Sequence, residues 1–452
     1  MSLIPFYIVP LTHPTWDEAL ACAKRLPSEA MPELRLDLFP DLEPEELIRG
    51  LGRRCVVTNR RASEGGRWEG SEAERLERLL VAADGRPSWL DLEWDLPIPE
   101  ALQAHRSHIR LIRSVHVAPG VFDLEARLQV LPEGDAYKWV GHAATLSDNA
   151  RLKPVLAWAR DHGLLLSAFL MGAKGIASRC LQQAWGGAFT YAAPDDGPSA
   201  APGQVPLSTM RGWRVHKLTR NHGLCGVLGS PVLHSRGPGF HNPRFQAAFK
   251  DLLYLPLDCG TADEALEALE CLPILGASLT APLKETLPPL LGLQGPLNTL
   301  WRRAPGQPWQ SANTDAVALR EALTKLAPGP VLVVGSGGVA HTTLTVLEEL
   351  RRPWLLASRK EALSRDEVVR FAPAGVIQAT SLGMKAEDPM PFPELLEAAK
   401  PSLRWAVEWI YKEDTAFAQW SREAGLHLVE GGALFEGQAL AQSKAFVTGC
   451  GE

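Results

Sequence analysis

The sequence lacks the cysteine pattern of a disulfide framework or a zinc site. Its 452 residues contain seven cysteines, an odd number, and they are scattered and never form a Cys-x-x-Cys pair. This usage is typical of reduced thiols in a cytosolic enzyme. We therefore expect no disulfide scaffold and no metal site.

A basic surplus and a long apolar run are also missing. The 46 lysines and arginines are outnumbered by 52 aspartates and glutamates, which gives a formal net charge of -6. Without a basic surplus, neither nucleic acid nor an anionic membrane is expected as the main partner, although local arginines can still bind small acidic substrates. No apolar run reaches the roughly 20 residues of a membrane helix, and no signal peptide is recognisable at the start. We expect a soluble, cytoplasmic protein.

The first ~210 residues alternate short apolar segments with charged amphipathic stretches such as 71–83 and 149–162. Eight segments are predicted as strands: 6–11, 33–39, 54–60, 88–94, 109–117, 136–141, 164–170 and 187–193. Eight strands that alternate with helices indicate an α/β protein with an N-terminal (β/α)8 barrel. The chemically interesting residues fall near the carboxyl ends of these strands, where barrel enzymes place their active sites.

After a polar, Gly/Pro-rich stretch, alternation restarts at residue 224, and residues 330–350 have the pattern of a buried strand, a glycine turn and a helix. The turn consists of Gly335, Ser336, Gly337, Gly338, Val339 and Ala340. Glycines between a strand and a helix let the backbone approach a pyrophosphate at the helix N-terminus, so a Rossmann-type cofactor site is predicted. A purely structural tight turn is the alternative.

The next predicted strand ends at Ser358, Arg359 and Lys360, about 20 residues after the turn. An NAD enzyme keeps an acid near this position for the ribose 2′-hydroxyl. A hydroxyl and two cations instead suit a 2′-phosphate, which predicts NADP(H); a solvated basic loop is the alternative.

Charged residues in the barrel half indicate a second site. Glu33, Arg35 and Asp37 occupy alternate positions, so they are expected on one face of a strand, where three charges would be costly as mere packing. Lys138 lies between two aromatic residues in an apolar strand, and burial would lower its pKa and free its amine to attack a ketone. His116 ends another strand and can exchange a proton near neutral pH.

In motif order, residues 1 to ~213 resemble the type I 3-dehydroquinate dehydratases. The resemblance implies Lys138 as the Schiff-base lysine, His116 as the acid–base group and Glu64 as the residue that orients it. It implies substrate contacts for Glu33, Arg35, Arg60, Arg179 and Gln204. The family often has a serine four residues before that glutamine, where this chain has Ala200 beside Ser199.

From Gly226 onwards the chain resembles the shikimate dehydrogenases. The resemblance implies Lys284 and Asp315 as the catalytic pair that moves the substrate's proton, with Asn313 in the same motif. It implies substrate contacts for Ser235, Thr280, Asn298, Tyr411 and Gln438, and a loop facing the nicotinamide with Thr380 and Met384. The family's second carboxylate-binding serine is Gly237 here, which removes a hydroxyl donor.

Together the motifs resemble the fusion of these two enzymes, which implies consecutive steps of the shikimate pathway. We expect a barrel over 1–213, a substrate-binding lobe over 222–325 completed by a C-terminal helix at about 433–450, and an NADP-binding Rossmann lobe over 326–432. The expected small molecules are 3-dehydroquinate, 3-dehydroshikimate and shikimate.

Two alternatives keep the same folds. Gly237 leaves room for a quinate/shikimate dehydrogenase that works with NAD in the catabolic direction. A regulatory metabolite sensor would instead be expected to lack the catalytic lysines, and both Lys138 and Lys284 are present.

Overall fold

A computed structural model describes residues 4–295, 297–359, 363–385, 387–411 and 414–451. It divides into two compact units, Met1–Ile274 and Leu275–Glu452. This division follows compactness in space, so the domain boundaries expected from the sequence stay a prediction. No helix in the described part of the chain is long and apolar enough to cross a membrane.

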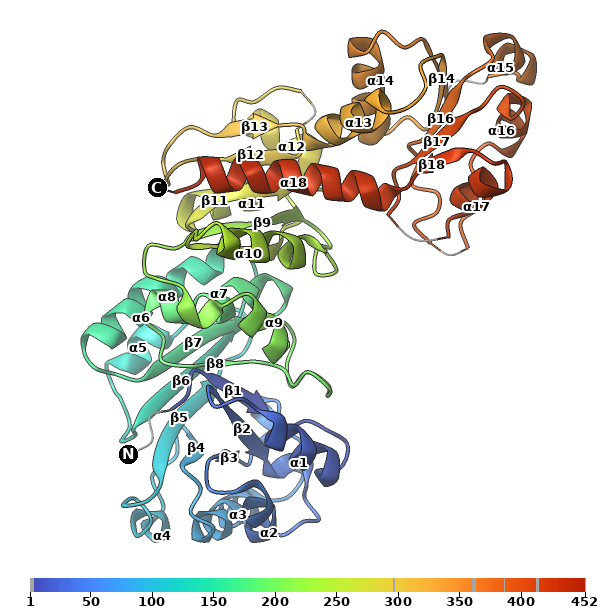
Figure 1. The fold of residues 1–452 in the computed structure, drawn as a ribbon. Coiled ribbons are helices and arrows are strands. Elements are labelled where there is room, and N and C mark those ends of the chain that lie inside the picture. Colours follow the sequence, from blue (N-terminus) through green and yellow to red (C-terminus); the bar gives the residue numbers. More distant parts are fainter. Residues whose placement is uncertain (1–3, 296, 360–362, 386, 412–413, 452) are drawn as a thin grey trace. The chain divides into compact units, whose positions relative to one another are not determined.

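The first unit contains an eight-stranded parallel sheet that curls into a nearly closed barrel (Figure 1), as predicted. Its order runs β7-β6-β5-β4-β3-β2-β1-β8. The strands are β1 (Tyr7–Pro10), β2 (Ala30–Arg35), β3 (Val56–Thr58), β4 (Trp89–Glu93), β5 (Arg110–His116), β6 (Ala136–His142), β7 (Leu166–Met171) and β8 (Thr190–Tyr191). The helices are α1 (Trp16–Arg25), α2 (Pro44–Leu51), α3 (Glu72–Asp84), α4 (Glu100–Gln103), α5 (Leu124–Leu128), α6 (Leu152–Asp161), α7 (Ile176–Cys180), α8 (Gln182–Trp185) and α9 (Leu207–Gly212).

Local chemistry explains where several helices begin. Thr15 and Glu18 form a reciprocal capping box at α1, and Ser71 and Glu74 form another at α3. These pairs satisfy backbone N–H groups that the first helical turn leaves without a partner.

The two ends of the barrel strands carry different kinds of side chains. Side chains from the strand starts pack as an apolar cluster inside the barrel, including Ile8, Met31, Val56, Trp89 and Ile112. The opposite, carboxyl ends of the strands are therefore free to carry polar side chains.

One strand differs from the sequence prediction. The segment predicted over 33–39 is displaced, because β2 ends at Arg35 and a 3-10 turn, η1 (Leu36–Leu38), follows. Asp37 therefore lies in η1 and not on the strand with Glu33 and Arg35. Its carboxylate turns back to form two hydrogen bonds of 2.8 and 2.6 Å with the Arg35 guanidinium, and this local ion pair explains the departure.

The first unit continues with β9 (Gly223–Gly229), α10 (Gly237–Ala247), β10 (Leu252–Asp258) and α11 (Ala262–Cys271), and β9 and β10 pair in parallel. Strand β11 (Ile274–Leu279) starts at the last residue of this unit.

In the second unit, β11, β12 (Thr299–Trp301) and β13 (Gln310–Ala312) pair antiparallel. Helices α12 (Leu283–Leu290), α13 (Thr314–Thr324) and the long C-terminal α18 (Gly431–Gly449) belong with them. Helix α18 begins within two residues of the expected C-terminal helix.

A parallel sheet in the order β15-β14-β16-β17-β18 forms the Rossmann-like part of the second unit (Figure 1). Its strands are β14 (Val331–Val334), β15 (Trp354–Ala357), β16 (Gly375–Gln378), β17 (Trp405–Glu408) and β18 (His427–Val429). Its helices are α14 (Gly338–Glu349), α15 (Arg365–Phe371), α16 (Pro393–Ala399) and α17 (Ala416–Glu423). The strand, turn and helix predicted around residue 335 are β14, the glycine turn and α14.

Candidate active sites

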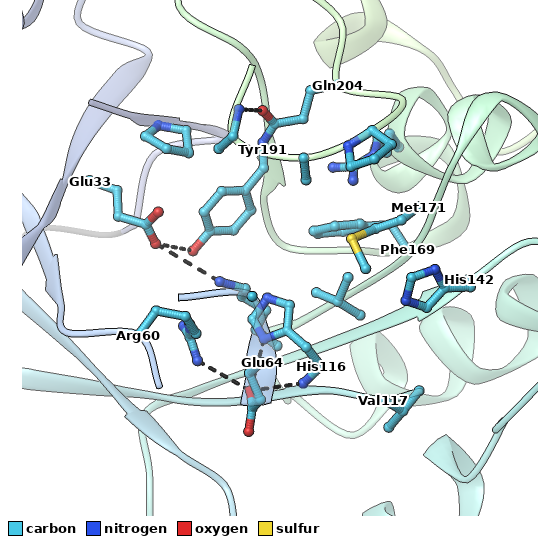
Figure 2. A pocket seen from close by; sticks show the side chains of 18 of the residues that line it. Glu33, Arg60, Glu64, His116, Val117, His142, Phe169, Met171, Tyr191 and Gln204 are labelled. Atoms are coloured by element: carbon cyan, nitrogen blue, oxygen red, sulfur yellow. Dashed lines mark hydrogen bonds and ion pairs between the residues drawn. The ribbon is translucent and has the colours of Figure 1, made fainter. Parts of the chain in front are cut away.

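The barrel holds a cavity of about 450 Å³ at the carboxyl ends of its strands (Figure 2). All eight barrel residues predicted from the sequence line it: Glu33, Arg35, Arg60, Glu64, His116, Lys138, Arg179 and Gln204. The first and last of these residues, Glu33 and Gln204, are 171 positions apart in the sequence. The structure thus brings the whole predicted barrel set to one place.

Lys138 lines this cavity, and only 4 % of it is exposed. Its Nζ is 3.4 Å from Asp91 Oδ2 and 3.9 Å from Glu33 Oε1, and it stands 4.2 Å from the centre of the Tyr191 ring. Burial lowers the pKa of Lys138 below its usual value, although Asp91 and Glu33 act in the opposite direction. The site therefore enriches the free amine, which is the nucleophilic form.

His116 and Glu64, which line the same cavity as Lys138, form a hydrogen-bonded pair (Figure 2). Glu64 Oε2 is 2.9 Å from His116 Nδ1 and also accepts the His116 backbone N–H at 3.0 Å. With the proton on Nδ1, the Nε2 lone pair is left available as a base. Burial first, and then the cations Arg60 and Lys138, hold the pKa of His116 well below 6.5, so the ring is neutral at physiological pH.

Arg60 has more protein partners than its predicted role as a substrate contact implies. Its guanidinium is 2.8 Å from Asp91, 2.8 Å from Ser114 Oγ and 3.4 Å from Glu64. Asp91 is buried, and Arg60 and Lys138 hold its pKa low despite that burial. Asp91 was not identified from the sequence; its position in the apolar strand segment SWLDLEW is the signal that could have revealed it.

Arg179 is a buried cation whose polar atoms are free. It is 1 % exposed, lies 4.3 Å from the centre of the Phe169 ring, and none of its three side-chain nitrogens has a hydrogen-bond partner among the described residues. Burial lowers its pKa to about 10. A buried guanidinium without partners is unfavourable unless an anion arrives, so this side chain is suited to bind a carboxylate from the cavity.

Gln204 belongs to the loop that borders the cavity after β8 (Figure 2). Its Oε1 accepts hydrogen bonds from the Ala200 N–H at 2.9 Å and from Ser199 Oγ at 3.2 Å. At this loop the backbone of Ala200 thus holds the glutamine, whereas the Ser199 hydroxyl is closer to the Ala201 carbonyl oxygen, at 2.8 Å.

A separate group, His13, Cys22 and Asp196, lies at the base of the same loop and is the one set of possible metal ligands found among the described residues. Asp196 is 3.1 Å from His13 Nε2 and forms an ion pair with Arg25. Burial, reinforced by Asp196, raises the pKa of the Cys22 thiol to about 12.

In the second unit, Lys284 of α12 and Asp315 of α13 form the predicted pair, with Nζ 2.5 Å from Oδ2. The Lys284 side chain is 24 % exposed and the Asp315 side chain 14 %. Asn313, two residues earlier, caps α13 by accepting the Ala316 N–H. The cap sets the start of α13 and thereby the position of Asp315.

Buried polar residues surround the start of α13. Asn298 Oδ1 accepts hydrogen bonds from the Thr314 backbone N–H at 2.8 Å and from Thr314 Oγ1 at 3.0 Å. Gln438 of α18 approaches the same Thr314 hydroxyl at 3.4 Å. The backbone carbonyl of Thr280 accepts the N–H of Lys284 at 3.1 Å. Three of the predicted residues, Thr280, Asn298 and Gln438, therefore connect, directly or through Thr314, to the two helix starts that carry the lysine and the aspartate.

Ser235 belongs to the first unit, just before α10, and its hydroxyl accepts the Gly237 N–H at 3.1 Å. A Cβ atom at Gly237 would lie 2.8 Å from a ring carbon of Tyr254. Since Tyr254 is buried, a serine at 237 would require a shift of that ring. The departure from the family pattern at 237 thus coincides with tight local packing.

The glycine turn has the geometry of a phosphate cradle. Gly335 has φ +123°, and a Cβ there would lie 2.6 Å from the Ala379 carbonyl oxygen, so only glycine fits. Gly337 caps α14, which begins at Gly338 and leaves the N–H groups of its first turn available. Ser336, Val339 and Ala340 lie within this turn and first helical turn. These features fit a pyrophosphate.

Other predicted cofactor residues follow neighbouring strands. Ser358 and the exposed Arg359 come directly after β15, whereas Lys360 lies outside the described residues. Thr380 follows β16, and its hydroxyl accepts the Leu382 N–H at 3.0 Å. Met384 is exposed at the end of that loop. Because β15 and β16 flank β14, these residues lie at the same edge of the sheet as the glycine turn.

Tyr411 follows β17 and is 47 % exposed, with its ring 5.3 Å from that of Phe435. The structure does not bring its side chain into any described hydrogen bond with the Lys284–Asp315 pair. Nearby, Glu408 is buried at the end of β17 and accepts hydrogen bonds from the Ile410 N–H and Thr415 Oγ1. Burial raises its pKa to about 7, a feature that the sequence did not reveal.

Comparisons with known proteins match two different families along the chain. Residues 7–214 match the family model of type I 3-dehydroquinase, and residues 227–295 match the shikimate dehydrogenase substrate binding domain. The chain is 26 % identical over 472 residues to the chloroplastic bifunctional 3-dehydroquinate dehydratase/shikimate dehydrogenase of Arabidopsis thaliana, covering 92 % of this chain and 77 % of that protein.

Over 193 residues, it is 34 % identical to a 3-dehydroquinate dehydratase of Dehalococcoides mccartyi, covering 41 % of this chain and 86 % of that protein. A solved structure of the dehydroquinate dehydratase and shikimate dehydrogenase from S. pombe AroM aligns with a TM-score of 0.41 and 19 % identity, covering 99 % of this chain and 96 % of that one.

Proposed function

We propose that this chain, which belongs to the type I 3-dehydroquinate dehydratase family and continues into a shikimate dehydrogenase, catalyses two consecutive steps of the shikimate pathway through the residues described above. The barrel removes water from 3-dehydroquinate, and the second activity reduces the resulting 3-dehydroshikimate to shikimate with a nicotinamide cofactor. The observation that carries the first assignment is the buried Lys138 beside the His116–Glu64 pair and Arg179 in one cavity.

In the proposed dehydration, the free amine of Lys138 attacks the ketone carbon, and loss of water gives a protonated Schiff base. The iminium acidifies the neighbouring C–H, and His116 Nε2 takes that proton. His116 then returns the proton to the departing hydroxyl, so the group leaves as water. Hydrolysis of the imine releases the product and restores Lys138.

The remaining barrel residues act on binding and orientation in this proposal. Arg179 holds the substrate carboxylate, since none of its side-chain nitrogens has a hydrogen-bond partner among the described residues. Glu64 fixes the His116 tautomer through its hydrogen bond to Nδ1. Glu33, Arg35, Arg60 and Gln204 shape and charge the cavity wall around the ring.

For the reduction, NADPH supplies a hydride to the ring ketone when it is bound. Lys284, oriented by Asp315 at 2.5 Å, delivers the proton that the developing alkoxide needs. Ser235, Thr280, Asn298, Tyr411 and Gln438 are the proposed contacts to the substrate.

We propose that Ser358 and Arg359 select NADP(H), because a hydroxyl and a cation directly after β15 suit the 2′-phosphate of that cofactor. The glycine turn from Gly335 to Ala340 is the proposed pyrophosphate site, and Thr380 and Met384 are the proposed neighbours of the nicotinamide. Lys360 is proposed as a second cation from its sequence position alone.

Borohydride trapping tests the barrel assignment. The protein is incubated with 3-dehydroquinate and sodium borohydride, and the mass of the intact chain is measured. We expect one reduced adduct on Lys138 and irreversible loss of dehydratase activity, with no adduct when borohydride is added alone. Absence of the adduct in the wild type, or its persistence in Lys138→Ala, would show that the barrel works in another way.

A coupled assay and a substrate comparison test the second assignment. Addition of 3-dehydroquinate should cause loss of NADPH absorbance through both sites in turn. Oxidation rates with shikimate and with quinate, each with NADP and with NAD, then separate the proposed enzyme from the catabolic alternative that Gly237 leaves open. A higher kcat/KM for quinate with NAD would favour that alternative.

A further inference from the structure

Glu264 connects the dehydrogenase part of the chain to the barrel within the first unit. It lies in the first turn of α11, inside the segment that matches the shikimate dehydrogenase domain. Its Oε1 accepts hydrogen bonds from Lys174 Nζ at 2.6 Å and from the Leu146 backbone N–H at 3.0 Å. Both donors belong to the barrel, so one carboxylate joins two barrel loops.

The Glu264 carboxylate is held by specific hydrogen bonds and is largely shielded from solvent. The Glu264 side chain is only 10 % exposed, and its Oε2 also accepts the Gly260 N–H at 3.3 Å. Burial by itself raises the pKa of Glu264, but hydrogen bonds from Lys174 and Leu146 outweigh it and hold the pKa below its usual value. The carboxylate is therefore charged and has three donors.

A buried asparagine carries the connection from these loops to the active site. The side-chain amide of Asn149 donates to the carbonyl oxygens of Leu146 at 2.8 Å and Lys174 at 2.7 Å. Its Oδ1 accepts the Ser178 N–H at 2.9 Å. Ser178 directly precedes Arg179, so the two loops that Glu264 joins are tied to the backbone that presents the guanidinium.

The same turn supports the loop that carries Gln204. Lys174 lies in the 3-10 turn η4 (Ala173–Gly175), and the N–H of Gly172, just before it, donates to the Pro202 carbonyl at 3.1 Å. Gly203 has φ +79°, and a Cβ there would lie 2.3 Å from the Gly172 carbonyl oxygen. Contact between the turn and the Gln204 loop is thus close.

We propose that Glu264 is a positioning residue for the dehydratase, supplied by the dehydrogenase part of the chain. It acts through Lys174 and Asn149 to hold Arg179 in the orientation that binds the substrate carboxylate, and it thereby makes the barrel site depend on the domain that follows it. The inference rests on the proposed role of Arg179. Lys138 and His116 lie on β6 and β5 and are not reached by this network, so substrate binding is affected and the chemical steps are not.

The test compares Glu264→Gln with Asp263→Asn. Asp263 is exposed in the same helical turn, so its variant removes the same charge next to the same helix terminus without touching the network. In Glu264→Gln we expect the KM for 3-dehydroquinate to rise on the order of tenfold with kcat little changed, because an interaction present in both ground and transition states is weakened. Asp263→Asn should match the wild type, and shikimate oxidation should be equal in the two variants.

A second background distinguishes positioning from general loosening of the fold. In an Arg179→Lys protein, Glu264→Gln should raise KM much less than it does in the wild type, because the residue through which it acts is already altered. Lys174→Met removes the other partner and should reproduce the KM effect, and it serves as the main variant if Glu264→Gln lowers the thermal midpoint. The double variant should be no worse than either single one.

Several outcomes would overturn the inference. Equal KM values for Glu264→Gln and Asp263→Asn, a fall in kcat at constant KM, or an undiminished effect in the Arg179→Lys background would each contradict it. If the wild type fails to dehydrate 3-dehydroquinate, the proposed function itself is wrong. If the wild type is an active dehydratase and Glu264→Gln has an unchanged KM for 3-dehydroquinate, only the positioning role of Glu264 is rejected.

Discussion

The two lysines for which we propose catalytic roles have different surroundings. Lys138 in the barrel is 4 % exposed, and two carboxylates and an aromatic ring surround its ammonium group. Lys284 in the second unit keeps a 24 % exposed side chain and one carboxylate at 2.5 Å. Burial lowers the pKa of Lys138 against the pull of its carboxylates. The contrast fits the proposed chemistry, because a nucleophilic amine has to lose its proton before it reacts.

Two buried carboxyl groups, Asp91 in the barrel and Glu408 in the second unit, differ in the direction in which their pKa is shifted. Asp91 at the barrel site has a lowered pKa because the cations Arg60 and Lys138 outweigh its burial. Glu408 in the second unit has a pKa raised to about 7, because burial is opposed only by hydrogen bonds from neutral N–H and O–H donors. Burial of a carboxyl group therefore does not set its charge; the neighbours do.

The largest effect is expected from exchanging each lysine for methionine. Lys138→Met removes the nucleophile and should lower the dehydratase rate by at least about 10³-fold, while shikimate oxidation stays normal. Lys284→Met should do the reverse, with a loss of about 10²- to 10⁴-fold in the dehydrogenase. Separate steady-state assays of the two reactions measure this. If either variant impaired both activities, the assignment of one lysine to each reaction would fail.

The next effect concerns the proposed base. His116→Gln should reduce the dehydratase kcat by roughly 10²- to 10⁴-fold, because a glutamine amide cannot accept the proton. His142 also lines the cavity and is the matched control, so His142→Gln should change kcat far less. The Schiff base should still form in His116→Gln and be trapped by borohydride. A larger loss of kcat in His142→Gln than in His116→Gln would show that His116 is not the base.

A smaller effect is expected at the cofactor site. Arg359→Leu should weaken NADP binding by about tenfold and leave NAD binding nearly unchanged, since only the phosphate form loses a charge-assisted contact. Equilibrium titrations at low and high salt would show the difference shrinking as salt screens the exposed charge. Arg365 is another exposed arginine further along the chain, and Arg365→Leu should not discriminate between the two cofactors.

The last prediction concerns stability as a function of pH. Glu408 has a pKa of about 7 when folded against 4.5 normally, so the folded state binds its proton more tightly. Its stabilising contribution is complete below pH 4.5 and is lost as the pH rises to 7, by roughly 3 kcal/mol. Glu408→Gln stays neutral and should unfold at a midpoint that changes less between pH 5 and 8.

Denaturant unfolding of Glu408→Gln and wild type at several pH values measures this difference. Glu423→Gln, which alters an exposed glutamate of the same unit, is the control and should follow the wild type. A wild-type curve that rises between pH 5 and 7 relative to Glu408→Gln would reverse the sign and contradict the buried neutral carboxyl.

Much of the fold could be predicted from pattern alone. Apolar strand segments that alternate with amphipathic helices predicted the barrel, and the strand, glycine turn and helix around Gly335 predicted the Rossmann-like sheet. The exact bounds of one strand were predicted incorrectly, because β2 ends at Arg35. Asp37 was expected on β2 but lies in η1, because a salt bridge to Arg35 is satisfied more easily where the chain turns.

By itself, the sequence determined which chemical groups are present and where each meets its strand or turn, because side-chain alternation and glycine conformation are local properties. Only the tertiary structure decided their protonation states and partners. The Glu64–His116 contact spans 52 positions, and Lys174–Glu264 spans 90. Desolvation and Coulomb attraction depend on distances between groups far apart in the chain, so the sequence predicted a lowered pKa for Lys138 but not that Asp91 and Glu33 oppose it.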